Sequence, residues 1–86
     1  MKPEDRYFRF VLWSEEDGLY IGYCPDLFYG GACHSKDEGE VYRTLVKLVR
    51  EEVADLAAAG KALPPPLTRP MQEIKFALVP IEAITT

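Results

Sequence analysis

The residues best suited to chemistry in this 86-residue chain are its two cysteines and its one histidine, Cys24, Cys33 and His34. Thiolate and imidazole groups bind zinc, but a zinc site needs about four ligands, usually including a closely spaced cysteine pair. Cys24 and Cys33 are too far apart in the sequence for such a pair, and no fourth ligand is evident. Neighbouring residues of a strand point to opposite faces, so Cys33 and His34 would not converge on one ion. The sequence therefore predicts no metal site.

The same residues could form a nucleophile pair, in which the imidazole removes the proton of the thiol. This arrangement would require Cys24 to reach His34 from a neighbouring strand; two small buried thiols are the more common outcome. The chain has no glycine-rich phosphate loop, no Ser-His-Asp set and no metalloprotease motif. We therefore expect no catalytic residue, no enzymatic activity and no cofactor.

Carboxylates are numerous, since the chain has 14 Asp and Glu against 10 Lys and Arg and a net charge of −4. Those at 15–17 fall in a predicted turn, and Asp37 and Glu38 fall at a predicted helix start. Asp26 is the least explained, although aspartate after a strand end often hydrogen-bonds its own backbone in a turn. An acidic chain without a basic face suits a basic protein partner better than RNA or DNA.

The hydrophobic pattern predicts a small α+β domain in the order β-β-β-α-β. Asp17-Gly18 between two aromatic-rich runs predicts a hairpin of strands at about 7–13 and 19–24. A short third strand is expected at about 32–34. These three strands would form an antiparallel meander.

One long helix is predicted at about 36–59, crossing the whole sheet, because apolar residues recur there at helical spacing. Ser35 and Glu38 have the spacing of a capping box at its start. Gly60 is expected at the C′ position, where the chain turns out of the helix.

A proline-rich connection at 61–72 is expected to lead to a last strand at about 71–81. The whole chain, 1–86, would then form a single domain with its core at about 7–81. No apolar run reaches the length of a membrane span, and the N-terminus has no apolar signal region. A cytoplasmic location and no contact with membranes are expected.

Self-association is predicted from the hairpin, because both of its faces are apolar and one helix covers only one face of a sheet. An apolar patch left exposed usually marks a protein interface. We therefore expect a dimer or tetramer. The expected interface residues are Tyr7, Arg9, Val11, Trp13, Ile21 and Tyr23.

The segment 18–66 resembles the HicB family of antitoxins, which have a partial ribonuclease-H-like fold. The shared features are an aromatic residue after the hairpin turn, Pro-Asp-Leu at the second strand end, a glycine in the third strand, a capped helix and a proline-rich exit. The residues that match are Tyr20, Pro25, Asp26, Leu27, Gly31, Ser35 and Pro64–Pro66. The resemblance extends over about 7–80.

This resemblance implies a module that binds and blocks a small basic HicA-type toxin that cleaves RNA, without nuclease activity of its own. The chain departs from the family pattern in two ways. Family members usually continue Pro-Asp-Leu with Pro-Gly-Cys, where this chain has Phe28-Tyr29-Gly30. Many members also carry a C-terminal DNA-binding domain, which we do not expect here, since the sequence ends at Thr86.

The expected toxin-contacting surface combines the bend after the second strand with the acidic start of the helix. Aromatic side chains can anchor in a pocket of the partner, while carboxylates meet its positive charge. The candidate residues are Asp26, Phe28, Tyr29, Asp37 and Glu38.

Three alternatives remain open from the sequence. Phe28 and Tyr29 could instead cover the end of the core. The chain could be a stand-alone nucleic-acid-binding module with a basic-aromatic surface, or a homo-oligomer that has no toxin partner. The residues of that basic-aromatic surface would be Arg6, Tyr7, Arg9 and Trp13.

Overall fold

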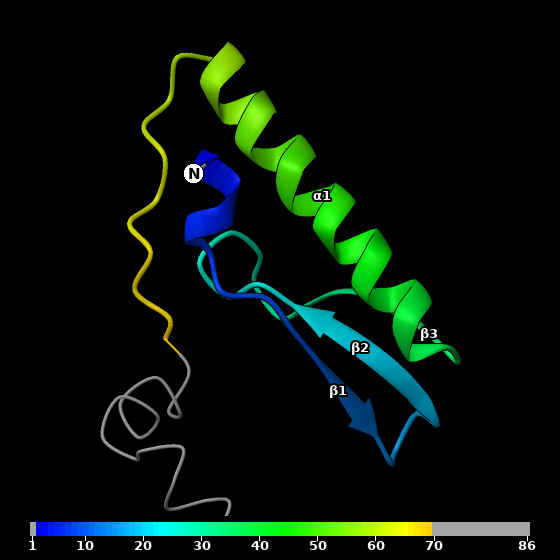
Figure 1. The fold of residues 1–86 in the computed structure, drawn as a ribbon. Coiled ribbons are helices and arrows are strands. Elements are labelled where there is room, and N and C mark those ends of the chain that lie inside the picture. Colours follow the sequence, from blue (N-terminus) through cyan, green and yellow to red (C-terminus); the bar gives the residue numbers. More distant parts are fainter. Residues whose placement is uncertain (1, 70–86) are drawn as a thin grey trace, which may run out of the picture.

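The computed structural model describes residues 2–69 as three strands and two helical segments (Figure 1). In chain order these are η1 (Pro3–Arg6), β1 (Phe10–Ser14), β2 (Leu19–Tyr23), β3 (Gly31–Ser35) and α1 (Glu38–Ala58). The strands form one antiparallel sheet in the order β1-β2-β3, and α1 crosses one face of it. The predicted α+β class and the antiparallel meander are confirmed. The strand predicted at 71–81 lies outside the described residues.

The β1–β2 hairpin closes through residues 15–18, as the Asp-Gly pair predicted. Gly18 has a φ of +64°, a left-handed conformation that glycine adopts without steric cost. Its amide donates to the Ser14 carbonyl oxygen at 2.8 Å, and the Ser14 hydroxyl donates to the Asp17 carboxylate at 2.9 Å. β1 starts at Phe10 rather than at Tyr7, because the chain at Tyr7 is leaving η1 and directs that side chain into the core.

The N-cap of α1 is Asp37, so the capping box predicted between Ser35 and Glu38 is wrong. The Asp37 backbone is still extended (φ −108°, ψ 118°), and its carboxylate accepts a hydrogen bond from the Glu40 amide at 3.1 Å. The Ser35 hydroxyl accepts instead from the Asp37 amide at 3.2 Å. The helix therefore begins at Glu38, and an aspartate rather than the serine satisfies one of its unpaired amides.

The end of α1 follows the prediction for Gly60. This glycine has a φ of +71°, and its amide donates to the Ala57 carbonyl oxygen at 3.1 Å. The amide of Lys61 reaches back to the Leu56 carbonyl oxygen at 2.9 Å. These two bonds form a Schellman motif, which satisfies carbonyl groups that a helix end otherwise leaves unpaired.

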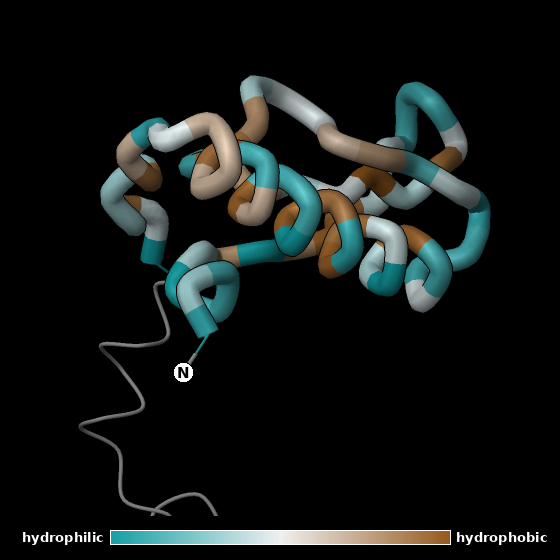
Figure 2. The backbone as a smooth tube through the Cα atoms, turned by 90° about the horizontal axis from the view of Figure 1, so that it is seen from above, coloured by the Kyte–Doolittle hydropathy of each residue, from teal (hydrophilic) through white to brown (hydrophobic). Residues whose placement is uncertain are grey.

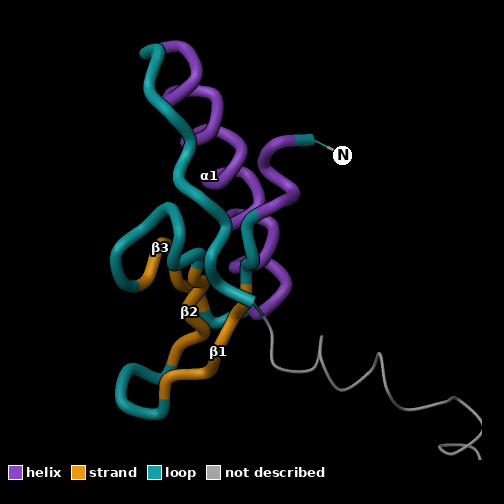
Figure 3. The backbone as a smooth tube through the Cα atoms, turned by 90° about the vertical axis from the view of Figure 1, so that its left-hand side faces the viewer, coloured by secondary structure: helices purple, strands orange, loops and turns teal. Residues whose placement is uncertain are grey.

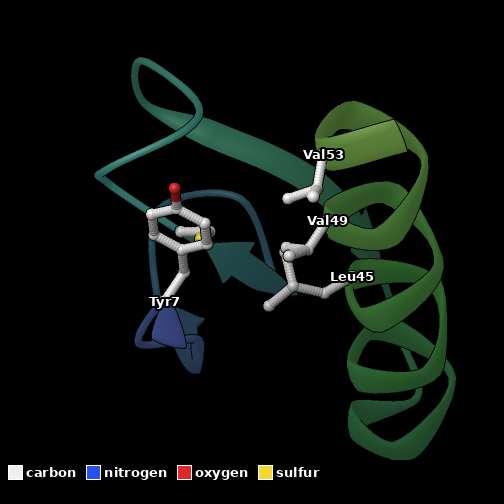
Figure 4. Close-up of a cluster of buried hydrophobic side chains, with 5 residues drawn as sticks. Tyr7, Leu45, Val49 and Val53 are labelled. Atoms are coloured by element: carbon white, nitrogen blue, oxygen red, sulfur yellow. The ribbon is translucent and has the colours of Figure 1, made fainter. Parts of the chain in front are cut away.

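The core lies between α1 and the sheet (Figure 4). Hydrophobic and hydrophilic residues alternate along the helix (Figure 2), and its buried residues recur every fourth position. Tyr7 and Cys24 complete the core from the opposite side, with 1% and 0% of their surface exposed. The buried residues of α1 are Val41, Leu45, Val49 and Val53.

Tyr7 is therefore not a residue of an oligomer interface, which corrects the prediction from the sequence. Its ring packs in the core, and its hydroxyl donates to the Pro64 carbonyl oxygen at 2.6 Å. A hydrogen-bonded tyrosine can be buried without leaving a polar group unsatisfied.

Residues 61–69 follow α1 as an irregular segment that runs back beside the helix toward the start of β1 (Figures 1 and 3). Leu63 packs against the core, and two side chains from elsewhere in the fold form hydrogen bonds with the segment. Tyr7 binds the carbonyl group of Pro64, and the Asp26 carboxylate accepts from the amide and the hydroxyl of Thr68. Within residues 2–69, no helix combines the length and the apolar composition needed to cross a bilayer.

The strand register divides the sheet into a helix face, which packs against α1, and an open face on the other side. Val11, Gly22 and Cys33 form one row on the helix face, where a Cβ atom added to Gly22 would lie 3.0 Å from Val41. Leu12 and Ile21 belong to the next row and point to the open face.

The predicted interface residues therefore do not share one face. Val11 and Trp13 lie on the helix face, whereas Ile21 and Tyr23 lie on the open face. Arg9 precedes β1 and donates from its guanidinium to the Glu4 carbonyl oxygen at 3.3 Å. The predicted interface residues therefore cannot all belong to one interface formed through a single face of this sheet.

Candidate functional site

The bend between β2 and β3 is the first part of the candidate contact surface. The amides of Leu27 and Phe28 both donate to the Cys24 carbonyl oxygen, at 3.0 Å and 2.9 Å. Gly30 then turns the chain into β3 with a φ of +74°. The bend is thus fixed at its base by the backbone of a buried residue.

Asp26 connects this bend to the segment that follows α1. Its two carboxylate oxygens accept from the Thr68 amide at 3.2 Å and from the Thr68 hydroxyl at 3.1 Å. Both hydrogen bonds are partly buried and join residues 42 positions apart in the sequence. Asp26, which the sequence did not explain by a local turn, thus makes a long-range contact. This contact fixes the bend further.

Phe28 and Tyr29 have different environments, although both were candidates for the partner surface. Phe28 is half-buried and packs against the hydrophobic core. Tyr29 has a relative exposure of 105%, so its ring contacts almost nothing else in the described part of the chain. The alternative that these two aromatic residues cover the end of the core therefore explains the position of Phe28 but not the exposure of Tyr29.

The acidic start of α1 is the second part of the candidate surface. Asp37 is occupied as the N-cap and also lies 3.7 Å from the Arg43 guanidinium. Glu38 and Glu40 are exposed in the first helical turn. The bend and this turn lie at the two ends of β3, roughly 17 Å apart at ~3.3 Å per strand residue. A partner would have to be large enough to contact both.

The cysteines and the histidine are not brought together. Cys33 lies on the helix face, where its Sγ donates to the Val41 carbonyl oxygen at 3.5 Å. His34, the next residue, is exposed and pairs with Ile21 on the open face. Cys24 is buried in the core. Among residues 2–69, no three histidine, cysteine or carboxylate side chains gather as a metal site would require.

Both thiols are poor nucleophiles in this fold. Burial raises the pKa of the Cys24 thiol, and the nearby Asp26 carboxylate raises it further. Burial also raises the pKa of the Cys33 thiol. Because the thiolate is the reactive form, both cysteines behave as packing residues.

A thiol-labelling experiment checks this assignment. At pH 8, Cys24 in the native protein should react with a disulfide reagent at least about tenfold more slowly than in urea, because it is inaccessible and protonated. A Cys33→Ser variant isolates the Cys24 signal, and a Cys24→Ser variant isolates that of Cys33. Native Cys24 that reacts as fast as the unfolded thiol would contradict the assignment.

Arginines gather at a cavity of about 340 Å³ beside η1. Arg6 and Arg9 contribute from the N-terminal segment, and Arg69 from the opposite end of the described chain. The other lining residues are Asp5, Tyr7, Phe8, Tyr42 and Thr68. The sequence grouped Arg6 with Arg9 but did not indicate Arg69, because only the return of the chain after α1 brings that residue beside them.

The basic-aromatic surface suggested by the sequence does not form as a unit. Arg6 and Arg9 line the arginine cavity, but the ring of Tyr7 is buried. Trp13 packs edge-on against Tyr20 toward the hairpin loop, with the ring centroids 4.9 Å apart. The nucleic-acid alternative therefore loses Tyr7 as a ring on which a base would stack, and Trp13 does not line the arginine cavity.

Comparison with known proteins gives no match: no family model, no curated protein and no solved structure matches this chain. The functional conclusion therefore depends on the residues and their geometry.

Proposed function

We propose that this chain is an antitoxin-like binding module that neutralises a small, basic, HicA-type RNA-cleaving toxin by direct contact. The observation that carries the proposal is Tyr29, a fully exposed aromatic side chain on a bend that the rest of the fold holds in place. It agrees with the resemblance of the sequence to the HicB antitoxins.

Tyr29 has the properties of an interface anchor. Tyrosine is enriched among the few residues that carry most of the energy of protein–protein binding. The bend beneath it is fixed by two backbone hydrogen bonds to Cys24 and by the contact of Asp26 with Thr68. Because the bend is ordered before binding, association loses little conformational entropy there.

Charge supports a basic partner. The chain has a net charge of −4, and Glu38 and Glu40 extend the candidate surface at the exposed start of α1. Opposite charges on two partners accelerate their encounter and disfavour acidic competitors. Asp26 and Asp37 add negative charge to the candidate surface, although each also forms a hydrogen bond within the fold.

The test is binding of this chain to the product of the neighbouring reading frame, measured by calorimetry. Replacing Tyr29 with alanine should weaken that binding by at least about 30-fold, the effect of losing an interface anchor. The matched control is Trp13→Ala, because Trp13 is also an exposed aromatic residue, at 47%, but lies on β1 and belongs neither to the bend nor to the helix start. This control should change the affinity by less than about threefold.

A salt series completes the experiment. Binding to a basic protein should weaken moderately with salt, and a parallel titration with an RNA oligonucleotide should show weak binding. Tight oligonucleotide binding with a steep salt slope, together with no binding to the neighbouring protein, would reject the proposal. It would favour the arginine cavity as a phosphate-contacting site.

A further inference from the structure

The arginine cavity beside η1 concentrates positive charge in an otherwise acidic chain. Three arginines and one aspartate line it, so the lining carries a net charge of +2, whereas the whole chain carries −4. Arg6 and Arg9 come from the N-terminal segment, and Arg69 comes from the segment that returns after α1. The aspartate, Asp5, already accepts a hydrogen bond from the Lys2 amide at 3.3 Å. Because like charges repel one another, an anion placed among these arginines would be stabilised.

The neighbouring carboxylate of Glu4 does not neutralise these arginines. It lies 3.6 Å from the Arg50 guanidinium of α1, and Glu4 offers Arg9 only its backbone carbonyl oxygen, at 3.3 Å. Within residues 2–69, no carboxylate forms an ion pair with Arg6 or Arg9. A guanidinium group has five N–H donors, so both side chains retain donors that an anionic ligand can use.

From this geometry we infer that the arginine cavity binds a small phosphate monoester that carries a ring. A guanidinium group presents paired N–H donors that match the oxygens of a phosphate. A phosphate monoester carries a charge of about −1.5 to −2 at pH 7, which balances the positive lining. A single carboxylate group would leave the arginines only partly compensated.

The size and the other walls of the cavity indicate the ring. Its volume of about 340 Å³ lies at the lower end of the range for small-molecule sites, roughly 300–1,000 Å³, so it has room for more than a phosphate group. Phe8 and Tyr42 line the same cavity, and Tyr42 has 44% of its surface exposed. Aromatic side chains pack favourably against other planar rings. The ring of the ligand is therefore expected beside these two side chains and its phosphate beside the arginines.

This ligand site is separate from the candidate toxin surface. None of the five candidate toxin-contacting residues lines the cavity. Asp26 is connected to it only through Thr68, which accepts no role in the toxin surface and lies in the cavity wall. Ligand binding here needs no toxin, so its failure would leave the toxin proposal untouched.

Calorimetric titration of the full chain with adenosine monophosphate at low salt is the first test. A dissociation constant of roughly 0.1 mM is expected for a ligand of this size at a partly exposed site. Adenosine, which lacks the phosphate, should bind at least about 30-fold more weakly, and ribose 5-phosphate, which lacks the base, at least about threefold more weakly. Adenosine that binds as tightly as the monophosphate, or succinate that binds more tightly, would overturn the assignment. So would an RNA oligonucleotide that binds more than about tenfold tighter, since it would indicate a nucleic-acid surface.

Substitution of one lining arginine is the second test. Arg6→Gln should weaken binding of adenosine monophosphate at least about tenfold, and because Arg6 is exposed the circular dichroism spectrum should not change. The matched control is Arg43→Gln, which removes the same charge from an exposed arginine outside the cavity and should change the affinity less than about twofold. In nuclear magnetic resonance spectra, the ligand should shift the amide signals of residues 5–9 and leave that of Tyr29 in place. Equal effects of the two substitutions, or no binding at about 5 mM ligand, would overturn the inference.

Discussion

Replacing Leu45 with alanine is expected to lower the free energy of unfolding by about 3 kcal/mol. Leu45 is 0% exposed and belongs to the core cluster that also contains Tyr7, Cys24 and Val49; its side chain points from α1 into the core (Figure 4). The substitution removes buried methyl groups and leaves a cavity that the surrounding strands and helix can close only in part. A domain of this size is stable by only about 5–10 kcal/mol, so the loss would be a large fraction of the total.

Urea unfolding followed by circular dichroism measures this effect. Leu48→Ala is the matched control, because it makes the same substitution in the same helix at a half-buried position. Helix propensity changes equally in the two variants, so their difference reports burial alone. Leu48→Ala should cost about 1 kcal/mol; equal losses in the two variants would contradict the position of Leu45 in the core.

The elements that sequence reasoning predicted well are those determined by local signals. The Asp17-Gly18 pair predicted the hairpin because few residues accept the left-handed backbone that its loop requires. Gly60 predicted the end of α1 for the same reason. The helical spacing of apolar residues also predicted α1, and its four buried residues follow that spacing, since an amphipathic helix shows its inner face in the sequence.

The incorrect predictions came from contacts between distant parts of the chain. Alternation along a strand placed Tyr7 on a surface, but the chain leaves η1 at that point and the ring turns toward α1. Ser35 and Asp37 both have side chains that can cap a helix, and the backbone angles rather than the sequence decide between them. The arginine cavity and the Thr68 contact of Asp26 depend on the return of residues 61–69.

For the candidate partner residues too, local sequence predicted some features, whereas others depend on the three-dimensional fold. The sequence predicted a bend after the second strand, and with it the position of Tyr29. Nothing in the sequence distinguished Phe28, which packs on the core, from Tyr29, which does not. Two adjacent aromatic residues have the same pattern, and only the direction of each side chain separates them.

Replacing Asp26 with alanine is expected to lower the free energy of unfolding by about 2 kcal/mol, because two partly buried hydrogen bonds to a carboxylate are lost. The Thr68 amide would also lose its acceptor. Asp26→Asn should cost less, since one carboxamide oxygen still accepts one of the two bonds. Thr68→Val removes the hydroxyl and keeps the amide, so it isolates one bond of the pair.

A double-mutant cycle between Asp26→Ala and Thr68→Val separates a structural role of Asp26 from a role in binding. If the two residues interact as the distances indicate, their effects on unfolding should be non-additive by about 1 kcal/mol. Additive effects would contradict the contact. If Asp26 acted mainly at the proposed partner surface, Asp26→Ala would weaken binding to the neighbouring protein and leave the unfolding free energy almost unchanged. We expect the opposite result: Asp26→Ala should mainly lower the free energy of unfolding, and Tyr29→Ala should mainly weaken binding.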